Sequence, residues 1–178
     1  FNFANYRTVT LSADEATTVT SLSVEATNNL VLTGANNITL ATDVTALSVD
    51  ASAMTGFVNA TFNNAMATAT GGAGADTFDF TSGTTTAVTA TGNAGNDSVD
   101  FSGGAATTVT FNGGAGNDTL TITATETGSL ILGNAGNDTI AAAELGKAYV
   151  VNAGAGDDIV TLGDVHATVV GGDGTDTL

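Results

Sequence analysis

The sequence predicts an all-β protein built as a parallel solenoid, in which short strands stack coil upon coil along one axis. A segment rich in glycine and aspartate recurs about every twenty residues in the second half of the chain. The stretches between these segments are rich in Thr, Val and Ile, whose β-branched side chains favour strands. The chain has 23 glycines and no proline, so Gly, Asn and Asp must make the turns.

The first seventy residues keep the strand rhythm without the aspartate segment. The sequence VTSLSVEA at 19–26 returns as VTALSVDA at 44–51, and short apolar runs lie at 30–32 and 38–40. Pairs of asparagines, which tolerate left-handed backbone, occupy the expected turns at 28–29, 36–37 and 63–64. We expect residues 1–70 to form metal-free coils that continue directly into a second part, 71–178.

The second part contains six related segments. They are GGAGAD at 71–76, GNAGND at 92–97, GGAGND at 113–118, GNAGND at 133–138, AGAGDD at 153–158 and GGDGTD at 171–176. Their final aspartates are spaced by 21, 21, 20, 20 and 18 residues. Alternating apolar residues follow each segment, as in Phe78/Phe80 and Val99/Phe101, and predict a strand with one face buried. A second short strand fits between successive segments, so each period predicts one coil.

Stacked coils would place the final aspartates in a file along one edge, at the usual strand spacing of about 5 Å. Neighbouring carboxylates at that distance repel by about 3 kcal/mol at an effective dielectric near 20, and a divalent cation between them removes the repulsion. Oxygen ligands on glycine-rich loops suit Ca²⁺ better than Mg²⁺, and zinc is disfavoured by the absence of Cys. The predicted side-chain ligands are Asp76, Asp97, Asp118, Asp138, Asp158 and Asp176.

These segments resemble the GGxGxD nonapeptide of the RTX (repeats-in-toxin) proteins. The resemblance implies a β-roll with one Ca²⁺ between loops one coil apart, and therefore up to about five ions. It also implies ligation, mainly through backbone carbonyls, by residues at the first, third and fourth places of each loop. These are Gly71, Ala73, Gly74, Gly92, Ala94, Gly95, Gly113, Ala115, Gly116, Gly133, Ala135, Gly136, Ala153, Ala155, Gly156, Gly171, Asp173 and Gly174.

Three residues depart from the motif. Ala153 replaces the first glycine and should weaken the sites that border Asp158, whereas Asn93 and Asn134 replace the second glycine and tolerate left-handed backbone. The alternative interpretation is that each segment is only a turn that closes two strands without metal. Six segments in register favour the metal site.

Charge and motifs exclude several other functions. The net charge of −16 argues against nucleic acid and against anionic membrane surfaces as partners, and no apolar run is long enough to insert into a bilayer. No catalytic motif is present and His166 is the sole histidine, so we expect no enzymatic activity. His166, Glu126, Glu144 and Lys147 are expected in turns. Threonines that point outward, such as Thr8/Thr10, suit strand formation better than ice binding.

Low Lys, no Cys and abundant Thr and Ala, together with LSVDASAMTG at 47–56 and GGDGTDTL at 171–178, resemble bacterial surface-layer (S-layer) proteins of the Caulobacter type. That resemblance implies type I secretion, folding by external calcium, and self-assembly into a lattice or filament on the cell surface. It allows contact with cell-surface polysaccharide through regions outside this chain. We expect the chain to be a segment of a longer protein. The alternative is an RTX module of a secreted adhesin, toxin or hydrolase.

Overall fold

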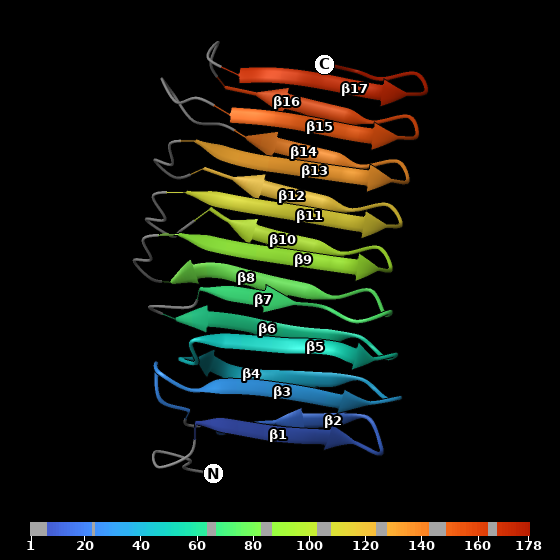
Figure 1. Ribbon diagram of the computed structural model, residues 1–178. Helices are drawn as coiled ribbons and strands as arrows, with labels where there is room; N and C mark the ends of the chain where they lie inside the picture. Colours follow the sequence, from blue (N-terminus) through green and yellow to red (C-terminus); the bar gives the residue numbers. More distant parts are fainter. Residues whose placement is uncertain are drawn as a thin grey trace.

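The protein is a two-sided parallel β-solenoid, as the sequence predicts (Figure 1). The computed structural model describes residues 7–22, 24–63, 67–82, 87–102, 108–123, 128–142, 149–163 and 167–178. Odd-numbered strands form one sheet of nine, and even-numbered strands form an opposite sheet of eight. Successive strands along the chain alternate between the sheets, so each pair of strands makes one coil.

The strand bounds are as follows. The nine-stranded sheet contains β1 (Thr8–Ala13), β3 (Asn29–Gly34), β5 (Ser48–Met54), β7 (Thr68–Thr70), β9 (Val88–Ala94), β11 (Val109–Ala115), β13 (Ser129–Ala135), β15 (Tyr149–Ala155) and β17 (Ala167–Asp173). The eight-stranded sheet contains β2 (Thr17–Val19), β4 (Ile38–Val44), β6 (Val58–Asn63), β8 (Thr77–Ser82), β10 (Ser98–Phe101), β12 (Thr119–Ile122), β14 (Thr139–Ala142) and β16 (Ile159–Leu162).

All pairings are parallel and place like residues in rows along the solenoid. One inward row of the nine-stranded sheet passes through Leu30, Val49, Phe111 and Ile131, all at most 1% exposed. The alternation that the sequence predicts after each segment is confirmed, since Phe78, Val99 and Leu120 are buried in register on the opposite sheet. The apolar side chains of each coil are therefore buried only because neighbouring coils stack on it.

The two sheets run without a break across residue 70. Strand β6 pairs with β8, and β7 pairs with β9. Aromatic rings fill the core at this junction, where the ring centroids of Phe62 and Phe80 lie 4.7 Å apart and those of Phe80 and Phe101 lie 4.6 Å apart. The packed core therefore spans both the region without aspartate segments and the region with them.

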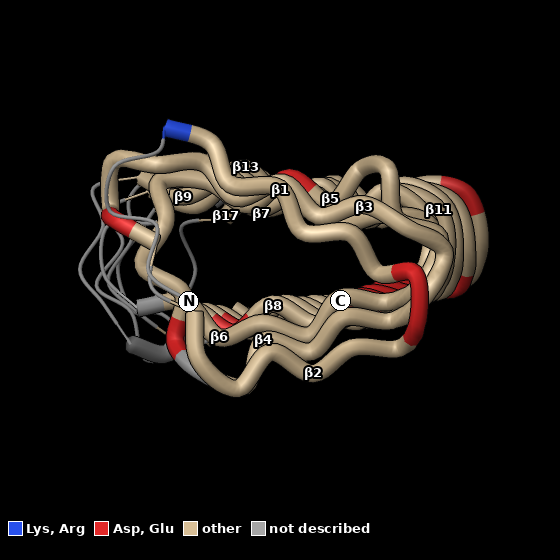
Figure 2. Tube along the Cα trace, turned by 90° about the horizontal axis from the view of Figure 1, so that it is seen from below, with Lys and Arg blue, Asp and Glu red and all other residues tan. Residues whose placement is uncertain are grey.

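The glycine- and aspartate-rich segments all lie at one edge of the solenoid. The first five connect the ends of β7, β9, β11, β13 and β15 to the next even-numbered strand, and the sixth begins within β17, at the right of Figure 1. Viewed along the axis, acidic residues gather at this end of the flattened cross-section (Figure 2). The strands are longer than the sequence predicts, because β9, β11, β13 and β15 continue through the first three residues of their segments. We refer to this side as the loop edge.

Candidate metal centre

Six aspartates form a hydrogen-bonded ladder along the loop edge. In five of them, from Asp97 to Asp176, the Oδ1 atom accepts a hydrogen bond from the backbone N–H of the corresponding aspartate one coil earlier. The N···O distances are 2.7 Å for Asp76 to Asp97, 2.8 Å for Asp97 to Asp118, 2.7 Å for Asp118 to Asp138, 2.7 Å for Asp138 to Asp158 and 3.1 Å for Asp158 to Asp176. The ladder therefore brings together the side chains that the sequence predicts as ligands.

The second carboxylate oxygen defines the candidate site. The Oδ2 atoms of Asp97, Asp118, Asp138 and Asp158 are buried and accept no hydrogen bond from the described residues. A buried carboxylate oxygen without a partner costs more free energy than an ordinary lost hydrogen bond, and native proteins rarely tolerate it. Four such atoms at equivalent positions indicate that each needs a proton or a cation.

The raised pKa values of these carboxyls also indicate that they need a proton or a cation. Burial raises the pKa of Asp97 to about 7 and, with a smaller contribution from the charges of Asp76 and Asp118, overcomes the lowering effect of its backbone hydrogen bond. Burial likewise raises the pKa of both Asp118 and Asp138 to about 6. Without a cation, several members of the ladder would therefore hold protons close to neutral pH.

The first residue of each loop brings a carbonyl oxygen to the same place. A methyl group placed on Gly92 would overlap both Asp97 Oδ2 and the carbonyl oxygen of Gly113 in the next coil. The same relation holds at Gly113, beside Asp118 Oδ2, and at Gly133, beside Asp138 Oδ2. Two oxygens from adjacent coils thus converge on a space that only a residue without a side chain leaves open. Hard oxygen donors from carboxylate and backbone are the ligands that Ca²⁺ prefers.

Ala153 is the exception at the first place. Its side chain is fully buried, and its methyl group lies where the other loops have none. The Oδ2 atom of Asp158 in the same loop still has no partner. That the sites bordering Asp158 are weaker than the others stays a prediction.

The backbone of the loops explains the remaining motif positions. From the second loop onward, the residues at the second and fourth places have positive φ, including Asn93 at 80° and Asn134 at 79°. Third-place carbonyls already accept hydrogen bonds from the preceding coil, as in Gly95 N–H to Ala115 O at 2.9 Å and Gly116 N–H to Ala135 O at 2.7 Å. Of the predicted carbonyl ligands, those at the first place approach the same point as the unpaired Oδ2 atoms.

A second ladder, which the sequence analysis missed, runs along the outside of the loops. It is formed by the residue before each aspartate: Asn96 Oδ1 accepts from the N–H of Asn117 at 2.8 Å, and Asn117 Oδ1 from that of Asn137 at 2.8 Å. Asn137 and Asp157 continue it. The repeated Asn-Asp pair in the sequence was the signal for it. This outer ladder needs no metal, because each amide oxygen is paired with an N–H.

Other candidate sites are weaker. No group of three or more Asp, Glu, His or Cys side chains that could hold a metal occurs in the described part of the chain. Any ion between two loops must take its other ligands from backbone carbonyls. His166, Glu126, Glu144 and Lys147 lie outside the described residues.

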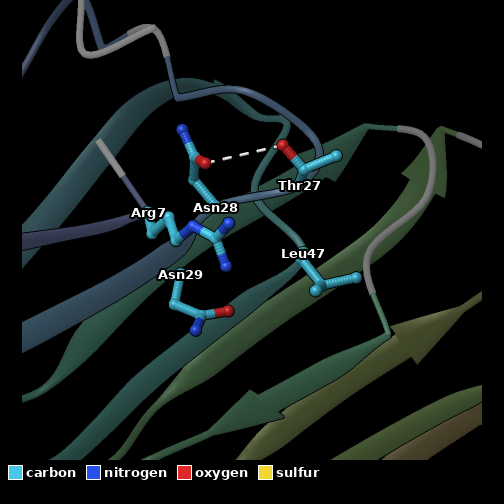
Figure 3. A pocket seen from close by; sticks show the side chains of 5 residues that line it. All are labelled: Arg7, Thr27, Asn28, Asn29 and Leu47. Carbon is cyan, nitrogen blue, oxygen red and sulfur yellow. Dashed lines mark hydrogen bonds between the residues drawn. The ribbon is translucent and has the colours of Figure 1, made fainter. Parts of the chain in front are cut away.

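A hollow of about 400 Å³ lies at the N-terminal end and is lined by Arg7, Thr27, Asn28, Asn29 and Leu47 (Figure 3). It sits where β1 and β3 begin, at the edge opposite the aspartate ladder. Among the described residues that line it, none is an Asp, Glu, His or Cys. Within the described ranges, no helix has the length and apolar character needed to cross a membrane.

Comparison with protein families gives a match to the RTX calcium-binding nonapeptide repeat (4 copies). The matched residues are 68–87, 82–107, 110–121, 123–144 and 150–166, which together make up just over half of the chain. The comparisons with curated proteins and with solved structures returned no match. The match falls on the loops that carry the buried, unpaired carboxylate oxygens, and the chain therefore belongs to the RTX calcium-binding nonapeptide repeat family.

Proposed function

We propose that this RTX repeat module is a structural segment of a bacterial S-layer protein, which folds outside the cell on binding calcium and assembles with copies of itself into a cell-surface lattice. The observation that carries the calcium-dependent part is the set of four buried carboxylate oxygens that lack partners. RTX repeats are typical of secreted bacterial proteins. No enzymatic role is proposed for these residues.

Folding and calcium binding are coupled in this proposal. Where calcium is scarce, the buried carboxylates oppose folding through burial and mutual repulsion. Where calcium is abundant, binding to sites that exist only in the folded chain supplies folding free energy. A segment of this kind stays extended during export and folds at its destination.

The outer face of the nine-stranded sheet supports contact between copies. Strands β7, β9, β11, β13 and β15 contain no charged residue, although the chain carries a net charge of −16. Leu130 and Val150 are neighbours in register on this face and are 39% and 48% exposed, and Val170 is 51% exposed. Two molecules of like charge approach each other at least cost through a surface without charge. The proposed occupant of this face is therefore a second copy of the chain.

Negative-stain electron microscopy of the full-length protein with calcium, and after chelation, tests the proposal. We expect two-dimensional sheets or filaments with calcium and dispersed particles without it. The variant Val150→Lys should keep its calcium-dependent far-UV circular dichroism but lose the sheets. Its matched control, Thr119→Lys, introduces the same charge at an exposed position on the opposite sheet and should leave assembly intact. Strand content that does not change on chelation would contradict calcium-driven folding.

A second candidate is a calcium-folded module of a secreted adhesin, toxin or hydrolase, whose activity would belong to other parts of the protein. It is favoured by the family match, which lies on the repeats and requires no assembly. Particles that fold with calcium and remain dispersed at high concentration would support this candidate over the lattice.

A further inference from the structure

The first aspartate loop, residues 71–76, differs in backbone conformation from the five that follow. Gly114, Gly154 and Gly172 at the second place have φ of 110°, 119° and 116°. Fourth-place glycines from Gly95 to Gly174 also have positive φ, between 120° and 138°. Gly72 and Gly74 occupy these two places in the first loop, and neither has φ in this range. The sequence GGAGAD therefore matches the motif while its backbone does not.

Contacts with the preceding coils account for this difference. A methyl group on Gly72 would overlap the carbonyl oxygen of Met54 and would lie 2.9 Å from that of Ala51. Both residues belong to β5. The N–H of Ala73 donates to Met54 O at 2.9 Å. The first loop thus packs on a coil that has no aspartate segment, whereas each later loop packs on another loop of the same kind.

Asp76 is already satisfied by the protein. Its Oδ1 accepts a hydrogen bond from the backbone N–H of Val58 at 2.6 Å, and its Oδ2 accepts one from the N–H of Gly72 at 2.7 Å. The four aspartates with unpaired Oδ2 atoms all lie in later loops. The demand for a cation that characterises those residues is therefore met at Asp76 by a backbone donor.

The neighbouring carbonyl is also engaged. The side-chain amide of Asn93, one coil later, donates from Nδ2 to the carbonyl oxygen of Gly71 at 2.7 Å. Asn134 occupies the same place in its loop, but its Nδ2 donates to Asn112 Oδ1 at 2.7 Å. The Asn134 amide therefore does not bind the first-place carbonyl of the preceding loop. Of the two oxygens that converge beside Gly71, Asp76 Oδ2 and Gly92 O, the first thus has a protein donor, and the carbonyl oxygen of Gly71 itself is held by an amide of the next coil.

We infer that loop 71–76 is a metal-free cap of the calcium ladder, that Asp76 is a positioning residue, and that the chain binds four calcium ions. Each ion would occupy a gap between two loops of the repeat conformation, and the five such loops have four gaps. Four divalent ions neutralise half of the net charge of −16. The cap supplies the fixed Asp76 N–H to which Asp97 Oδ1 bonds, and it thereby positions the first true ligand. This inference rests on the proposed calcium binding and deepens it.

Counting calcium tests the inference. The full chain is loaded with calcium, freed of excess ion, and examined by native mass spectrometry, alongside Asp76→Asn and its matched control Asp118→Asn. We expect four ions on the wild type, four on Asp76→Asn with a lower midpoint of thermal unfolding, and three or fewer on Asp118→Asn. Five ions on the wild type and four on Asp76→Asn would overturn the inference but leave the proposed function standing. A wild type that binds no calcium would overturn both.

A second measurement needs no variant and therefore remains decisive if Asp76→Asn fails to fold. Hydrogen exchange of the Gly72 amide in the wild type is compared with and without calcium. If Asp76 Oδ2 is bound by Gly72, that amide should be protected to the same extent in both conditions. Protection of Gly72 that falls on adding calcium would mean that the ion takes Asp76 Oδ2 from its donor, which contradicts the inference.

Discussion

The coils before residue 71 and those after residue 91 share one core and the same two parallel sheets, but close their corners with different chemistry. In the first region, Asn37 Oδ1 accepts the N–H of Phe57 at 3.1 Å, and Asn36 Nδ2 donates to Asp14 O at 2.7 Å. In the second region, aspartates accept the backbone N–H groups of the preceding coil through Oδ1, and in four of them Oδ2 is buried without a partner. A neutral amide can pair both its oxygen and its nitrogen, whereas a carboxylate has only acceptors. Stacking of the coils alone therefore leaves no oxygen of the described residues in need of a cation; the aspartate at the corner creates that need.

The largest expected effect is a difference in calcium dependence between the two regions. In hydrogen exchange of the full chain at pH 8, chelation should reduce amide protection in β9 to β17 by about a hundredfold or more, since ligand at a hundred times its Kd contributes about 2.7 kcal/mol per site. Protection in β3 to β6 should change little. Equal loss of protection in both regions would break the comparison and indicate that the solenoid unfolds as one cooperative unit.

Core truncation sharpens the same comparison. Leu30 and Ile131 lie in one inward row and are both fully buried. Leu30→Ala and Ile131→Ala should each cost about 2 to 5 kcal/mol of unfolding free energy. Added calcium should offset the loss at Ile131 but not that at Leu30, because only the C-terminal coils gain binding free energy. Thermal unfolding across a calcium titration measures both, and an equal response to calcium in the two variants would contradict the prediction.

Acid should partly replace calcium. Burial raises the pKa of Asp97 to about 7 and that of Asp118 to about 6, above the value of 3.8 expected for an unfolded chain. The folded calcium-free protein therefore binds more protons than the unfolded one, and the resulting stability is lost as pH rises through these folded pKa values. The calcium-free C-terminal coils should melt several degrees higher at pH 5 than at pH 8.

The control for this prediction is the calcium-loaded protein. There the trend should reverse, because protons compete with calcium for the same oxygens. A calcium-free protein whose midpoint rises from pH 5 to pH 8 would show that the buried carboxylates are already paired in another way.

The smallest expected effect concerns Ala153. Its buried methyl group lies in the space that glycine leaves open in the other loops. Ala153→Gly should tighten the weakest calcium site by about fivefold, since relieving an overpacked methyl group is worth about 1 kcal/mol. Calorimetric titration would show the last binding step moving to lower calcium concentration. The reciprocal change Gly133→Ala should weaken one step that is tight in the wild type.

The repeat explains why so much was predictable from the sequence. Six segments at nearly constant spacing predict one similar turn per coil. The solenoid, the loop edge and the file of aspartates along it could therefore be predicted from the spacing of the aspartates between Asp76 and Asp176. The first loop could not be predicted in this way, because its conformation is set by Met54 and Ala51 in a coil outside the repeat. Ala75, which stands where later loops have Asn96, Asn117 and Asn137, was the visible difference.

The parallel, in-register stacking also determines how such a chain can change length. From β9 to β17, successive strands of the nine-stranded sheet pair in one repeated register, so duplication of about twenty residues inserts a coil without disturbing the others. Each insertion lengthens the body by one strand spacing, about 4.8 Å, and, with the proposed one ion per gap, adds one calcium site. Duplication of coils would therefore increase the length of the solenoid and the number of its calcium sites together, in fixed steps.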